Sequence, residues 1–146
     1  MAIWQYTFHI LPKESTKQFN IKEGIENDLF WKITPIQKTL FNEVDLVLTL
    51  NKSWSDEIDL YGSVESNCLE VAFYKTDNTI ISASLRIDFT SNYEAILNSL
   101  IQFFILKGLI IVNEEFNLTP LNYEVIKTTI ETSPQFIKYN KLLSTQ

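Results

Sequence analysis

Alternating apolar and polar residues near the start of the chain predict a β-strand. Over residues 3–11 the apolar side chains fall on one face, and Gln5, Thr7 and His9 fall on the other; the apolar set is Trp4, Tyr6, Phe8 and Ile10. A period of two is typical of a strand with one buried face, and Pro12 ends it. In residues 13–33 the apolar positions fit a helix or a strand, and both interpretations stay open there.

Two capping signals predict helices in the middle of the chain. Thr34-Pro35-Ile36-Gln37 combines a cap residue, a first-turn proline and a capping-box partner, so we expect a helix from there to about Leu50. Ser91 and Glu94 form a second capping box, followed by apolar residues at helical spacing. Gly108 is placed to end that helix.

Two proline-containing starts predict helices nearer the end of the chain. Thr119-Pro120 and Ser133-Pro134 each place a cap residue before a first-turn proline. We expect these helices to continue to about Glu131 and Leu143.

Alternation also predicts three central strands, and a short apolar run predicts a fourth at 109–112. In residues 57–64, Ile58 and Leu60 fall on one face and Asp59 and Tyr61 on the other. The strands at 69–73 and 81–89 read as a hairpin whose apolar faces, including Phe73 and Ile81, must lie on the same side of the sheet. This parity requires an odd loop length, which Thr76-Asp77-Asn78 satisfies with Asn78 in the left-handed conformation.

The order of these elements indicates an α+β fold. We expect a mainly antiparallel sheet of about four to five strands, packed against helices on one side. Neither a repeat nor a linker divides the 146 residues, so a single domain spanning 1–146 is expected.

The composition argues against an enzyme. One histidine, one cysteine and three glycines are too few for a clustered metal site or a phosphate-binding glycine loop, so we expect no metal and no cofactor. His9 and Cys68 could form a nucleophilic pair only if the fold brought them together. Arg86 is the one arginine of the chain, and we expect it to pair with Asp88 or with an acid on a neighbouring strand.

The charge of the chain narrows the choice of partner. A net charge of −6 disfavours a nucleic-acid partner, because affinity for phosphate comes from clustered lysine and arginine. Apolar runs are too short to span a bilayer, and the start of the chain lacks the pattern of a signal peptide. We therefore expect a cytoplasmic protein that does not bind membranes, while the oligomeric state stays open.

Trp54 is the strongest candidate for function. It lies among polar residues, which makes it either an exposed binding residue or a side chain folded back onto the sheet. An aromatic side chain among acids is typical of a protein-binding hot spot that faces a basic partner. The candidate protein-binding residues are Trp54, Asp56, Glu57, Asp59, Tyr61, Glu114 and Glu115.

The chain resembles the small bacterial immunity proteins that neutralise polymorphic or contact-dependent toxins. The resemblance rests on the acidic α+β format, the opening Trp4-Gln5-Tyr6-Thr7-Phe8-His9-Ile10-Leu11-Pro12, and the Ser53-Trp54-Ser55 loop. It implies a non-enzymatic protein that binds a toxin domain, often through charge complementarity. Two other interpretations stay open: a small-molecule or lipid-binding domain whose pocket is lined by Trp4, Tyr6 and Phe8, and an oligomeric scaffold.

Overall fold

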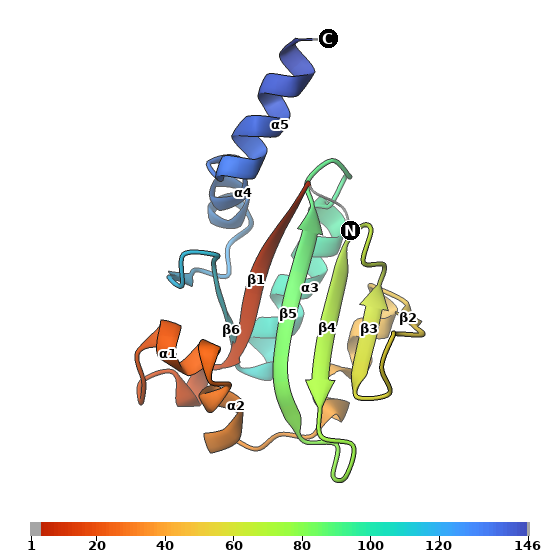
Figure 1. Cartoon of the computed structure of the whole chain (residues 1–146), viewed down its shortest axis with the longest axis vertical. Coiled ribbons are helices and arrows are strands. Elements are labelled where there is room, and N and C mark those ends of the chain that lie inside the picture. Colours follow the sequence, from red (N-terminus) through yellow and green to blue (C-terminus); the bar gives the residue numbers. More distant parts are fainter. Residues whose placement is uncertain (1–3, 146) are drawn as a thin grey trace.

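A seven-stranded antiparallel sheet forms the centre of the computed structural model, in the order β2-β3-β4-β5-β1-β6-β7 (Figure 1). The structure describes residues 4–145, so Ile3 at the start of the predicted first strand lies outside them. The strands are β1 (Gln5–Pro12), β2 (Leu50–Asn51), β3 (Ile58–Gly62), β4 (Cys68–Phe73), β5 (Ile80–Asp88), β6 (Leu109–Val112) and β7 (Leu118–Thr119). The α+β class is confirmed. The sheet has more strands than the four to five expected, because β2 and β7 have two residues each and are too short to show alternation.

Helices cover one face of the sheet along most of its width. The helical elements are η1 (Lys13–Ser15), α1 (Ile21–Glu26), α2 (Leu29–Ile33), η2 (Lys38–Leu46), α3 (Glu94–Lys107), α4 (Tyr123–Glu131) and α5 (Pro134–Ser144). Tyr6, Phe8 and Ile10 face α3, which lies behind the sheet in Figure 1, and they share one core with Leu97 and Phe104. The alternation predicted for the first strand is therefore confirmed from Gln5 onward.

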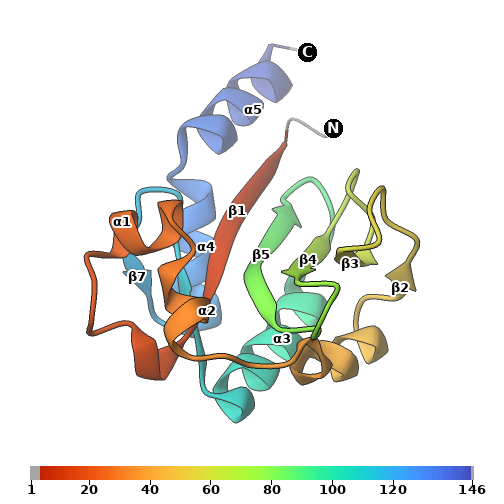
Figure 2. The same ribbon diagram turned by 60° about the horizontal axis from the view of Figure 1, so that its bottom comes forward.

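On the other face of the sheet, α1 and α2 cover the part formed by β1, β5 and β6. Leu11, Phe30 and Val112 form a second, smaller core there, beneath α1 and α2. Figure 2 shows α2 in front of the lower end of β1, with α1 beside it. Segment 13–33, which fits either pattern in sequence, is thus mainly helical. It places helices on the second face, where none were expected.

The helix expected at Thr34 begins later, at Lys38, and is a 3-10 helix. The backbone before it is extended and lies against the hairpin turn. Ile80 N donates to Ile36 O at 2.9 Å, and Lys38 N donates to Asn78 O at 2.8 Å. These long-range bonds use backbone groups that the first turn of a helix would have needed, so the Thr34-Pro35 signal is overridden.

At two other predicted helix starts, the side chain expected to cap the helix does not do so. Ser91 donates to the Asp88 carbonyl, and α3 begins at Glu94 without a side-chain cap. Thr119 belongs to β7, and Asn122 caps α4 instead. The start at Ser133 is confirmed, since its hydroxyl accepts from Phe136 N.

Gly108 ends α3 as expected, with a positive φ of 68°. At this angle a residue with a side chain is strained, and glycine is not. The strand predicted directly after it, 109–112, matches the observed β6.

A bulge changes the register of the β4–β5 hairpin. Leu69 and Val71 face Leu85 and Ala83 as expected, but the pairing shifts after Ala72, so Phe73 lies opposite Ile80 and not Ile81. Ile80 is therefore the buried member of that pair. The predicted three-residue loop of odd length is therefore wrong, because Tyr74 bonds Thr79 and residues 75–78 form the turn. Asn78 adopts the predicted left-handed conformation, with a φ of 61°.

Candidate functional site

Trp54 is exposed to solvent on a loop that its own hydrogen bonds hold in place. Its side chain is 62% exposed, which rejects the alternative in which it folds back onto the sheet. Ser53 Oγ donates to Ile58 O at 2.6 Å, and Ser55 N donates to Ser53 Oγ at 3.2 Å. Glu57 N donates to Ser55 Oγ at 3.1 Å. The serines on either side of Trp54 therefore fix the loop that presents the indole.

The indole lines a shallow groove of about 450 Å³ at the β2–β3 edge of the sheet, here called the Trp54 groove. Leu50 is the second exposed apolar residue of its wall. Phe73 also lines the groove, and Lys38 Nζ lies 3.9 Å from the centre of its ring. The groove thus combines exposed apolar side chains with a cation held over an aromatic face.

Two of the three acids near Trp54 are paired with lysines. Asp56 bonds Lys75 at 2.5 Å, and this hydrogen bond lowers the pKa of the Asp56 carboxyl. Asp59 bonds Lys38 at 3.2 Å. Glu57 is exposed and has no ion pair among residues 4–145. This edge is therefore less negative than its sequence indicates.

Tyr61 does not belong to this surface. It lies opposite Leu69 on the face of β3 that turns toward the main core, and it is 2% exposed. Burial raises the pKa of its phenol to about 12. The prediction that it extends a binding surface is wrong, because the alternation of β3 identifies two faces without showing which one meets the core.

Glu114 and Glu115 lie at the opposite edge of the sheet, in the turn between β6 and β7. The Glu114 carboxylate accepts from Thr7 N at 2.8 Å and from Gln135 Nε2 at 3.0 Å. β6 pairs with β1 over His9 to Pro12, so Glu114 continues the hydrogen bonding of this edge of β1 at Thr7, before the paired stretch begins. The structure does not bring these two acids together with Trp54.

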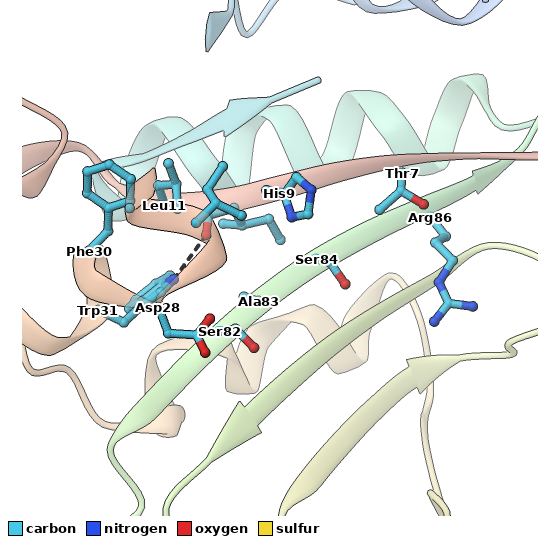
Figure 3. Close-up of a pocket in the computed structure, with 13 residues that line it drawn as sticks. Thr7, His9, Leu11, Asp28, Phe30, Trp31, Ser82, Ala83, Ser84 and Arg86 are labelled. Atoms are coloured by element: carbon cyan, nitrogen blue, oxygen red, sulfur yellow. Dashed lines mark hydrogen bonds between the residues drawn. The ribbon is translucent and has the colours of Figure 1, made fainter. Parts of the chain in front are cut away.

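A cleft of about 310 Å³ opens on the second face of the sheet, between α1–α2 and the strands β1 and β5 (Figure 3). β1 contributes Thr7 and His9, and β5 contributes the alternate residues Ser82, Ser84 and Arg86. Asp28, Phe30 and Trp31 form the wall on the helical side. We call this site the β1–β5 cleft.

The α2 wall of the cleft is fixed to the sheet by one indole. Trp31 Nε1 donates to Ile10 O at 3.1 Å, as the dashed line in Figure 3 shows. Asp28, in the left-handed conformation with a φ of 54°, precedes α2. Its carboxylate points toward Ser82 in Figure 3, and partial burial raises the pKa of that carboxyl.

Most polar side chains of the cleft have no protein partner. Within residues 4–145, the side chains of Thr7, His9, Asp28, Ser82 and Ser84 make no hydrogen bond to the protein. Arg86 is the exception, since it pairs with Glu70 on the neighbouring strand. This is the cross-strand alternative expected for Arg86.

Sequence reasoning placed Arg86, Ser82 and Ser84 on one polar face but missed the cleft. The missing wall comes from Asp28 and Trp31, in the segment whose structure the sequence left open. The polar alternation of β1 and β5 was the available signal, because both strands present hydrogen-bonding groups on the same face.

His9 and Cys68 do not form a nucleophilic pair. β5 lies between their strands, and His9 stacks on Phe116 with the ring centres 5.9 Å apart. Burial raises the pKa of the Cys68 thiol to about 11, which keeps it in the poorly nucleophilic thiol form.

The region between the sheet and the helices, which the small-molecule alternative would use as a pocket, is occupied by packed side chains. Tyr6 and Phe8 are buried in the main core, and Trp4 packs against Tyr139 of α5. Over the part of the chain that the structure describes, three or more His, Cys, Asp or Glu side chains nowhere gather as metal ligands would. Within the same residues, every helix is too short or too polar to cross a bilayer.

Comparisons of the chain with protein-family models, curated proteins and solved structures give no match. What the protein does is therefore inferred from the geometry of its surface.

Proposed function

We propose that the chain is a non-catalytic protein-binding module and that the Trp54 groove is its docking surface. The observation that carries this proposal is the exposure of a tryptophan on a loop fixed by Ser53 and Ser55. Tryptophan is enriched among the few residues that dominate the energy of protein interfaces. A loop that is already ordered loses little conformational freedom on binding, so more of the contact energy appears as affinity.

Exchange of an exposed ion pair and the net charge of the chain support a basic partner. The Asp56–Lys75 pair is largely exposed, and such pairs contribute little stability because water and salt screen them. A basic side chain of the partner can therefore replace Lys75 at the Asp56 carboxylate. Glu57 and the net charge of −6 add to the attraction of a basic surface.

The resemblance to immunity proteins supports a specific partner class. In this proposal the partner is a basic toxin domain, and the chain blocks that domain by covering its active surface in the cytoplasm. Exposed apolar side chains at the groove supply affinity, and the surrounding charges supply orientation and a fast encounter.

The test begins with co-purification of the tagged chain from its source cells and identification of the bound protein. Binding of the purified partner is then measured by calorimetry. We expect Trp54→Ala to weaken binding by about 2 kcal/mol or more, which is about 30-fold, while the thermal unfolding midpoint changes little.

The matched control is Leu118→Ala, which removes an exposed apolar side chain at the opposite edge of the sheet. This variant should bind as the unmodified chain does. Equal affinity for the Trp54→Ala variant and the unmodified chain would reject the groove as the docking surface. Turnover of a substrate by the purified chain would reject the non-catalytic role itself.

A further inference from the structure

The β1–β5 cleft has the arrangement of a ligand site. Its floor carries the short side chains of Ser82 and Ser84, and a helical wall rises beside them. Register pairs His9 with Ser84 and Thr7 with Arg86, so two strands present polar groups side by side along the cleft. Alternate residues of a strand lie about 6.5 Å apart, so the hydroxyl groups of Ser82 and Ser84 have about this spacing and Arg86 follows at about the same distance from Ser84.

One charged group in the cleft lacks an ion-pair partner within residues 4–145. Glu70 neutralises Arg86, whereas the carboxylate of Asp28 forms no ion pair in this range. Lys32 on α2 is near enough to lower the pKa of that carboxyl but not to bond it. Burial lowers the pKa of the His9 imidazole, with an opposing effect from Glu114, so His9 is mainly uncharged at neutral pH.

The surroundings of Asp28 favour a ligand that carries a positive charge or a hydrogen-bond donor. A partly buried carboxylate is costly unless an opposite charge or a donor compensates it. Ile25 of α1 lines the cleft on the same side and is half-buried, so it offers an apolar surface that suits the carbon skeleton of a ligand. Phe30 and Trp31 are almost fully buried and hold this wall in place. Serine and threonine hydroxyls and a neutral imidazole both donate and accept hydrogen bonds, so they match ligand hydroxyl groups.

We propose that the β1–β5 cleft binds a small hydroxylated amine of the amino-sugar class, with its ammonium group on Asp28 and its hydroxyl groups along Ser82, Ser84 and His9. A volume of about 310 Å³ is at the lower end of the range for ligand pockets, which suits a monosaccharide-sized molecule. This proposal is independent of the Trp54 groove, because the two sites lie on different parts of the sheet.

The probes are glucosamine and glucose, which differ by an ammonium group in place of one hydroxyl. Binding is followed near neutral pH through the backbone amide shifts of His9, Ser82 and Ser84 in NMR titrations. We expect saturable shifts with glucosamine and an affinity for glucose that is lower by a factor of about ten or more. The reason is that a hydrogen bond between charged groups is stronger than one between neutral groups. Asp28→Asn should remove this difference, and Ser84→Ala should weaken the binding of both sugars.

Asparagine tolerates the left-handed conformation of position 28, so Asp28→Asn is expected to fold. Trp54→Ala is the control, and it should titrate as the unmodified chain does. The proposal is overturned if glucosamine causes no saturable shift, if glucose binds as tightly, or if Asp28→Asn keeps the preference. Nα-acetyl-lysine amide tests the other source of an ammonium group: affinity equal to that of glucosamine would overturn the sugar in favour of a protein lysine.

Discussion

Asp28 combines an uncommon backbone conformation with an unfavourable position for a charge. Its φ of 54° lies in the left-handed region, which short polar side chains adopt more readily than others. Burial between the helical wall and the sheet raises the pKa of its carboxyl, and Lys32 opposes this by a smaller amount. A raised pKa means that the ionised carboxylate is less stable in the folded chain than in the unfolded chain.

Asp28→Asn should therefore raise the melting temperature near neutral pH. Because the folded pKa is the higher one, the cost of ionisation is absent below the unfolded pKa, near pH 4, and it appears as the pH rises through the folded value. Thermal unfolding of both proteins across a pH series measures this. We expect the gain from asparagine to shrink as the pH falls.

The low-pH end of that series is an internal control. There the carboxyl is protonated, so any remaining difference reflects only the preference of asparagine for left-handed backbone. A variant less stable than the unmodified chain near neutral pH would contradict the expected cost of the charge.

At single residues, sequence left the exposure of the key aromatic side chains open. The polar neighbours of Trp54 allow either an exposed side chain or one folded back onto the sheet, and the structure shows the exposed alternative. Tyr61 alternates with Leu60, and the pattern does not say which of the two meets the main core. Its pairing with Leu69 decides this, and that contact is set by register rather than by local sequence.

The α1–α2 pair depends on close packing at a glycine. Gly24 is buried within α1, and a Cβ atom added there would lie 2.3 Å from Phe30 Cε2. Phe30 is itself enclosed by Leu11 and Val112 in the second core. The ring therefore has little room to move aside, and the wall of the β1–β5 cleft rests on this contact.

Gly24→Ala should destabilise the protein although alanine is the better helix former. The gain in helix propensity is about 1 kcal/mol, whereas overpacking a closed core costs about 1–3 kcal/mol. We expect a net loss of about 1 kcal/mol in chemical denaturation, with changed amide shifts along β1 near Leu11.

Lys22→Ala is the matched control on the same helix, because Lys22 is exposed. Its effect should stay within about 0.5 kcal/mol. Higher stability for Gly24→Ala than for the unmodified chain would show that Phe30 moves aside freely.

At the scale of elements, the sequence predicted the helices and strands that depend only on residues close together in the chain. The strand at 109–112 needs only a short apolar run after a glycine, and it forms as expected. The start at Thr34 failed because Ile36 and Lys38 bond the backbone of residues 78–80, forty or more positions away. The cleft was missed for the same reason, since its two walls meet only in the folded chain.

Across the whole molecule, hydrogen bonding and burial by neighbouring elements decrease from the central strands to α5. β1 and β5 each pair on both sides within the sheet. α5 has no buried residue, and it extends away from the sheet in Figures 1 and 2. It contacts the core through Phe136 and Tyr139, while Leu142 and Leu143 near its end are about half exposed.

Native-state hydrogen exchange should resolve this gradient. We expect amides of β1 and β5 to exchange only through global unfolding, so their exchange free energy falls with denaturant at the slope measured for the whole protein. Amides in the last turns of α5 should exchange through local opening, with a much lower free energy and almost no denaturant dependence. Repeating the measurement at several protein concentrations is the control. Protection of α5 equal to that of β1, rising with concentration, would contradict local opening, because it would mean that a second copy covers Leu142 and Leu143.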